Sequence, residues 1–216
     1  MHTRRRFISH VIATSASLVA PTFASIAAHA NTIVRGTIIG PGAVDDEKLG
    51  KRRFYLGIVD LDAPNEEAVK TIETDFFAHG VSPDPINPER ASLFQKQGSG
   101  ACEVDLKSRT VLRPIETAKD RRFYGHGAYS PDGATLYCTE TIMSDPNLKG
   151  IIAVRDAKSH DYLGEFPSYG AQPHDCQLLD DGKVIAVTNG GLAVGDENRG
   201  NVSFVEIETQ KLLDQV

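Results

Sequence analysis

The chain has 216 residues, no tryptophan and a formal net charge of −6 at pH 7. An acidic protein of this kind repels a phosphate backbone, so no nucleic-acid partner is expected. Its three cysteines, Cys102, Cys138 and Cys176, form no CxxC pair, which argues against the zinc and redox chemistry of such motifs. Each lies in an apolar, strand-like stretch, so buried thiols are expected.

The first 30 residues are predicted to be an export signal rather than part of the fold. Residues 3–8, TRRRFI, place an arginine pair and a spacer before two apolar residues, and an apolar stretch and a small-residue exit, Ala28-His29-Ala30, follow. The arginine pair indicates the twin-arginine route and a periplasmic location. The alternative is a cytoplasmic chain with a basic, alanine-rich first helix. Once the signal is removed, no membrane anchor is expected.

The predicted mature domain, residues 31–216, contains 20 basic and 29 acidic residues and has a net charge of −9. Twin-arginine substrates cross the membrane already folded, and many carry a cofactor that was loaded beforehand. The predicted route therefore raises the expectation of a bound metal or cofactor without identifying one.

The mature domain repeats itself. The stretches HGAYSPDGATLYCTE, from His126, and HDCQLLDDGKVIAVTNGG, from His174, both contain a histidine, an apolar strand, an Asp-Gly turn and a second apolar strand. His79 opens a looser version, and the spacing between successive histidines is 47 and then 48 residues. Such a period is typical of stacked repeat architectures.

A second sequence pattern, which begins with a glycine, also recurs at a regular spacing. Alternating strand patterns begin at Gly100, Gly150 and Gly200, and each is followed by a polar turn and another strand pattern. LGIVDLDAPNEEAVKTIE, from Leu56, resembles an earlier copy. Each unit therefore holds about four short antiparallel strands, which together with the period predicts an all-β fold, a β-propeller. A β-sandwich is the alternative, but it would not repeat a marker set.

About four blades are expected in the chain. Seven blades of this size would need roughly 300 residues or more, so a partial or truncated seven-bladed ring is expected. A natural four-bladed ring and closure by a second copy are the alternatives. An open ring would expose an unpaired strand edge.

The motifs GHGAYSPDG, GEFPSYGAQPHDCQLLDDGK and VTNGG, together with the leader, resemble a bacterial family known only as a conserved domain of unknown function. The resemblance covers most of the mature chain. It implies an exported seven-bladed propeller, related in shape to the YVTN propellers and to the β-chain of quinoprotein amine dehydrogenase. Genes of this family often lie near exported iron-uptake proteins, which implies a periplasmic partner linked to iron uptake.

Three histidines occupy matching places in the repeats. His79, His126 and His174 each precede a strand that would be innermost in its blade, so their side chains are expected to meet at the mouth of a central channel. Converging imidazoles suit a transition metal, with copper and iron as candidates. The alternative is a structural role, in which each histidine bonds neighbouring backbone.

Three polar residues join the candidate binding site, two of them by hairpin counting. The chain runs seven residues from His126 to the turn and seven back, so Glu140 is expected beside His126. By the same count Asn189 is expected near His174, and Asp175 adds a carboxylate.

No catalytic residue is predicted, and the balance favours a protein that is not an enzyme. The first hypothesis is an exported propeller that binds a small ligand or a protein through its channel face. The second is a metal-binding or redox propeller that uses the three histidines.

Overall fold

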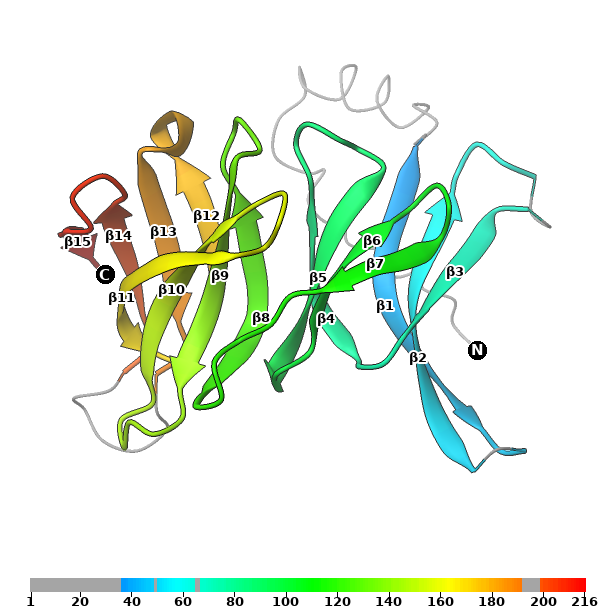
Figure 1. The fold of residues 1–216 in the computed structure, drawn as a ribbon, viewed down its shortest axis with the longest axis horizontal. Coiled ribbons are helices and arrows are strands. Elements are labelled where there is room, and N and C mark those ends of the chain that lie inside the picture. Colours follow the sequence, from blue (N-terminus) through cyan, green and yellow to red (C-terminus); the bar gives the residue numbers. More distant parts are fainter. Residues whose placement is uncertain (1–35, 49, 65–66, 192–198) are drawn as a thin grey trace, which may run out of the picture. The chain divides into compact units, whose positions relative to one another are not determined.

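The structure, a computed structural model, describes residues 36–48, 50–64, 67–191 and 199–216, and the predicted signal peptide lies outside them. The described chain is all-β, as predicted, with antiparallel ladders between sequential strands (Figure 1). The first sheet has three strands in the order β1-β2-β3: β1 (Thr37–Asp46), β2 (Lys51–Asp60) and β3 (Val69–Thr74).

Three four-stranded meanders follow, and each corresponds to one repeat of the sequence (Figure 1). The first blade contains β4 (Ala78–Pro83), β5 (Arg90–Gly98), β6 (Ala101–Asp105) and β7 (Thr110–Pro114). The second contains β8 (Arg121–Tyr129), β9 (Thr135–Ile142), β10 (Lys149–Asp156) and β11 (Tyr162–Ala171). The third contains β12 (Pro173–Leu179), β13 (Val184–Asn189), β14 (Asn201–Glu206) and β15 (Leu212–Gln215). A short pairing between β5 and β8 joins the first two blades.

The turns form where the sequence predicts them. In the β8–β9 hairpin the Gly133 amide donates to the Ser130 carbonyl, and the Asp132 carboxylate accepts from the Ala134 amide. Gly133 has a φ of 68°, a left-handed conformation that glycine adopts without steric cost. The outer turns share a different device, in which Asp105 and Asp156 each accept two backbone amides from the residues that follow.

The hydrophobic core is divided among the spaces between successive sheets. Because side chains alternate along a strand, β9 sends Leu136 and Cys138 toward the first blade and Tyr137 toward the third. A further cluster, which includes Leu56 and Leu93, fills the space between the β1–β3 sheet and the first blade. Each inner sheet is therefore covered on both faces, which explains why TLYCT and IIAV are continuous apolar runs.

All three cysteines are free and buried, as expected. Burial raises the pKa of Cys102 and of Cys138 to about 12, so both are protonated thiols near neutral pH. In the part of the chain that the structure describes, no helix has the length and apolar character needed to cross a lipid bilayer.

His160 is a buried histidine outside the predicted site. It lies in the β10–β11 turn with a φ of 64° and is 6% exposed. Neither ring nitrogen has a hydrogen-bond partner in the described chain. Burial is the main cause that lowers its pKa below 6.5, and the charges of Arg113 and Arg155 act in the same direction. Folded His160 is therefore neutral.

We expect His160 to make the fold less stable in mild acid. Below pH 6.5 the unfolded chain binds a proton at His160 that the folded chain excludes, so stability falls as the pH decreases. The limit for one proton is about 1.4 kcal/mol per pH unit. Asparagine tolerates the left-handed backbone of this position and does not titrate. The variant His160→Asn should therefore lose less stability than wild type as the pH falls below 6.5.

Urea denaturation at pH 7.5, 6.0 and 5.0 measures the effect. Wild type should lose more stability than the variant between the first and last pH. Parallel profiles for the two proteins would contradict the assignment.

Candidate metal centre

The three predicted histidines converge. One ring nitrogen from each of His79, His126 and His174 lies within 4.8 Å of the other two. The Nε2 atoms of His79 and His174 are 3.4 Å apart, and the three ring centroids are separated by 5.0–5.1 Å. Among the described residues, no other group of three histidine, cysteine or acidic side chains comes together in this way.

The cluster forms because three inner strands come together. His79, His126 and His174 lie on β4, β8 and β12, and β8 contacts both β4 and β12. These are the first strands of three consecutive blades, so equivalent positions face a common axis, as expected for a propeller.

Each histidine lies at an irregularity in its strand. The β4–β5 register shifts between Ala78 and Gly80, across His79. The β12–β13 register shifts across His174 in the same way, and the β8–β9 register shifts between Phe123 and Gly127. An extra residue in one strand is left unpaired, interrupts the ladder locally and turns the side chain at that position in a new direction. Three separate bulges therefore direct three imidazoles to one point.

Two glycines leave the space that the imidazoles occupy. A Cβ at Gly125 would lie 2.9 Å from Cδ2 of His79 and 3.3 Å from Cε1 of His174. Gly125 also has a φ of 132°, which other residues rarely adopt. A Cβ at Gly80 would lie 2.1 Å from the Gly125 carbonyl oxygen and 2.8 Å from Nδ1 of His126. Any larger residue at either position would displace the cluster.

The backbone fixes the orientation of one ring. Nδ1 of His174 lies 3.1 Å from the carbonyl oxygen of Tyr124. Because a carbonyl only accepts, Nδ1 carries the proton and donates, which leaves a lone pair on Nε2. Tyr124 is itself held by its hydroxyl, which accepts from Gln97 and donates to Gln172. A backbone carbonyl behind a histidine is the usual support for a metal-ligating imidazole.

The surroundings favour uncharged rings. Burial is the main cause that lowers the pKa of His79 and of His126, and the neighbouring His174 lowers both further. The Asp175 carboxylate opposes this shift, and its Oδ1 lies 3.7 Å from Nδ1 of His126. Near neutral pH, His79 and His126 therefore present the neutral form that binds metals. Asp175 lies beside the cluster as predicted.

Glu140 does not lie beside His126, which corrects the hairpin count. The bulge in β8 shifts the register, so Glu140 pairs with Phe123 and Thr139 faces His126 instead. The Thr139 hydroxyl donates to the His126 carbonyl at 2.8 Å. The Glu140 side chain is buried, where it accepts from Nη2 of Arg155 at 2.8 Å and from the Thr117 hydroxyl at 2.9 Å.

Asn189 reaches the expected place along the chain but turns its side chain elsewhere. It pairs with Pro173, the residue before His174. Its buried amide bonds the Ser168 carbonyl and hydroxyl and the side chains of Asn201 and Ser203. Asn189 therefore links the third blade to the second, and its amide makes no hydrogen bond to the three histidines.

Sequence reasoning missed the backbone contributors, Tyr124 and Gly125. A signal was available, because a glycine directly before His126 is unusual in the interior of a strand and often marks a bulge or a close approach.

A cavity of about 490 Å³ adjoins the cluster. His126 and Asp175 form part of its wall, together with Ser82 and Gln177. A small molecule could therefore reach the imidazole of His126 from this side.

Comparisons with known proteins agree with a β-propeller. Residues 74–209 match a family model described as "Protein of unknown function (DUF1513)". The match spans more than half of the chain, so the chain belongs to this family. A search of curated proteins by sequence gives no match.

Solved structures share the fold at low sequence identity. Hydrazine synthase of Kuenenia stuttgartiensis aligns with a TM-score of 0.61 and 16% identity over 86% of this chain and 51% of that one. The β-propeller domain of the trilobed protease from Pyrococcus furiosus, which has an open velcro topology, aligns with a TM-score of 0.52 and 15% identity. That match covers 85% of this chain and 54% of the other. The chain thus spans about half the length of these structures, and the likeness concerns the fold alone.

We expect the Glu140–Arg155 pair to serve stability. The two side chains are 2% and 3% exposed, so removing one charge leaves the other buried without a partner. Glu140→Leu should therefore cost about 3–5 kcal/mol, and the double variant Glu140→Leu/Arg155→Met should recover most of it. Urea denaturation of the three proteins tests this expectation. A loss below about 1 kcal/mol for the single variant would contradict the burial argument.

Proposed function

We propose that this chain is an exported β-propeller that binds one transition-metal ion through His79, His126 and His174. The observation that carries the proposal is the convergence of three ring nitrogens within 4.8 Å, from three separate bulges. A purely structural role for the histidines would need only one backbone bond for each ring. It would not require the three rings to meet at one point, in space that Gly80 and Gly125 leave for them.

The spacing of the nitrogens suits a metal. Metal–nitrogen bonds of about 2.0–2.1 Å in a tetrahedral site place ligand nitrogens about 3.3 Å apart. The separation of 3.4 Å between the Nε2 atoms of His79 and His174 already matches this value. The third nitrogen lies up to 4.8 Å away, which a small rotation of the side chain can close.

The donor set favours particular metals. Neutral imidazoles without a thiolate suit copper, iron, zinc and nickel, and disfavour calcium and magnesium. Copper and iron remain our candidates. Three protein ligands leave a coordination position open, and the cavity beside His126 and Asp175 gives an outside ligand access to it. We assign no reaction to the site, and binding of a small ligand through the metal is sufficient to explain this arrangement.

Metal content of the full-length protein tests the proposal. Protein incubated separately with copper, iron and zinc salts, then desalted, should retain about one ion per chain for at least one metal. His126→Ala and His174→Ala should each weaken binding by at least about 100-fold, more than the loss of a supporting residue costs. His160→Asn is the matched control, because it removes a buried histidine outside the cluster and should retain the metal.

Two outcomes would contradict the proposal. One is a folded wild type that retains none of these metals. The other is a variant with all three histidines replaced that still binds as tightly as wild type. The first outcome would leave the propeller as a metal-free binding module for a small ligand or a protein.

Export by the twin-arginine route is part of the proposal and rests on the sequence of the leader. Arg4→Lys/Arg5→Lys conserves charge but removes the arginine pair, and it should abolish periplasmic delivery. Cell fractionation followed by immunoblotting gives the measurement, and Arg52→Lys in β2 is the control for loss of a surface arginine. Unchanged delivery of the Arg4→Lys/Arg5→Lys variant would contradict the assigned route.

The partner proposed for the exported protein is a periplasmic component of iron uptake. Its support is the resemblance noted in the sequence, together with a candidate site whose donors suit iron.

A further inference from the structure

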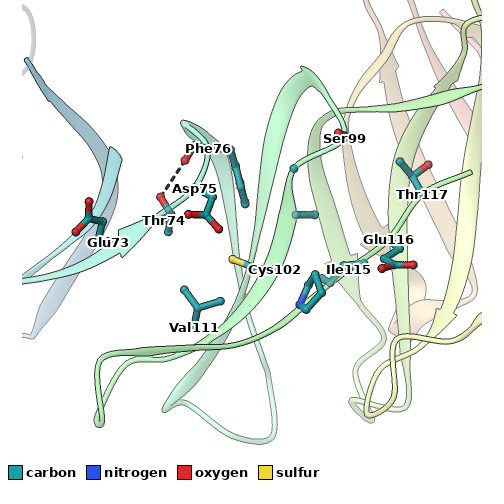
Figure 2. A pocket seen from close by; sticks show the side chains of 13 residues that line it. Glu73, Thr74, Asp75, Phe76, Ser99, Cys102, Val111, Ile115, Glu116 and Thr117 are labelled. Atoms are coloured by element: carbon teal, nitrogen blue, oxygen red, sulfur yellow. Dashed lines mark hydrogen bonds between the residues drawn. The ribbon is translucent and has the colours of Figure 1, made fainter. Parts of the chain in front are cut away.

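A second cavity, of about 640 Å³, lies between the β3–β4 segment and strands β6 and β7 (Figure 2). It shares no lining residue with the histidine cluster. Its apolar wall includes Phe76, Val111 and the buried residues Cys102 and Ile115. Figure 2 shows the Cys102 sulfur directed into the cavity, between Asp75 and Val111. The volume falls in the range of ordinary small-molecule sites.

The charged groups around this cavity have one sign. Glu73, Asp75 and Glu116 line it, and the described residues of its wall include no lysine, arginine or histidine. Arg53 binds Glu73 through two hydrogen bonds and neutralises it. Asp75 and Glu116, in contrast, have no hydrogen bond or ion pair within the described chain. Two exposed carboxylates without a counter-charge therefore border a partly apolar space.

An inorganic ion does not fit this arrangement. Apart from the three histidines, the described chain has no set of three ligating side chains close enough to coordinate a metal. The apolar wall would also leave most of the coordination sphere of a hard cation without oxygen ligands.

We propose that this cavity binds a small organic cation, which is attracted by the carboxylates of Asp75 and Glu116 and whose apolar part contacts Phe76 and Val111. The negative potential of these two carboxylates draws a cation toward the cavity. The Phe76 ring offers both apolar contact and an attractive face for a cation. The proposal is independent of the metal centre.

Cys102 provides a probe within the cavity itself. Because burial raises the pKa of Cys102 to about 12, labelling is run at pH 9, where more of the reactive thiolate is present. Two methanethiosulfonate reagents of similar size, one with a trimethylammonium group and one with a sulfonate, should then react with it at different rates. We expect the cationic reagent to react at least about 10-fold faster, because the local potential concentrates cations. Cys138 and Cys176 are 0% and 1% exposed and should remain unmodified in the folded protein. Peptide mass spectrometry identifies the modified residue, and Cys102→Ser gives the background.

Charge-removing variants separate the cavity from the overall acidity of the protein. Asp75→Asn/Glu116→Gln should reduce the preference for the cationic reagent to near unity. Glu208→Gln/Asp214→Asn removes the same charge from exposed positions outside the cavity and should leave the preference intact. Rates for each variant are compared with those of a neutral methanethiosulfonate, so altered thiol reactivity cancels.

Protection from labelling tests binding directly. Phenethylammonium at millimolar concentration should slow labelling of wild-type Cys102 by the neutral reagent, and 2-phenylethanol at the same concentration should not. Equal rates for the cationic and anionic reagents would overturn the proposal. A preference that survives Asp75→Asn/Glu116→Gln, or equal protection by the alcohol, would overturn it as well. None of these results depends on metal binding at the histidines.

Discussion

Packing of successive sheets against each other is the constraint on which the candidate metal centre depends. Apolar clusters fill the spaces between neighbouring sheets, and β9 contributes side chains to two of them. Burial of both faces leaves the blades little freedom to slide, since a slip of one residue would exchange the two sets of side chains. The inner strands β4, β8 and β12 are thereby held side by side, and the histidines are positioned by packing that lies away from them.

The three bulges at the histidines reduce the stability of the sheets. Each one leaves ladder positions unpaired, and Gly125 adds a backbone conformation that other residues rarely adopt. Burial also disfavours the charged forms of His79 and His126. Irregular backbone and desolvated titratable groups at one point are typical of sites kept for binding. A regular ladder with apolar residues at these positions would satisfy the fold alone.

The sequence was sufficient to predict the blades and the meeting of the three histidines, because both follow from a repeat period. It was not sufficient to place Glu140 and Asn189. Counting along a hairpin assumes a regular ladder, and the bulge in β8 moves Glu140 opposite Phe123 and into a buried pair with Arg155. The cavity beside Asp75 could not be predicted from the sequence either, because its wall joins residues from β3–β4, β6 and β7 that no local pattern connects.

The two candidate sites would select cations by different physical means. At the histidine cluster the ligands are uncharged, so selection rests on coordination geometry and on the preference of borderline metals for nitrogen. In the cavity beside Asp75 the attraction is between charges, and contact with the apolar wall favours a cation that has a hydrocarbon part. A hydrated metal ion gains little from that wall, and an organic ammonium cannot coordinate to imidazole lone pairs. One propeller can therefore hold both kinds of cation without competition between the sites.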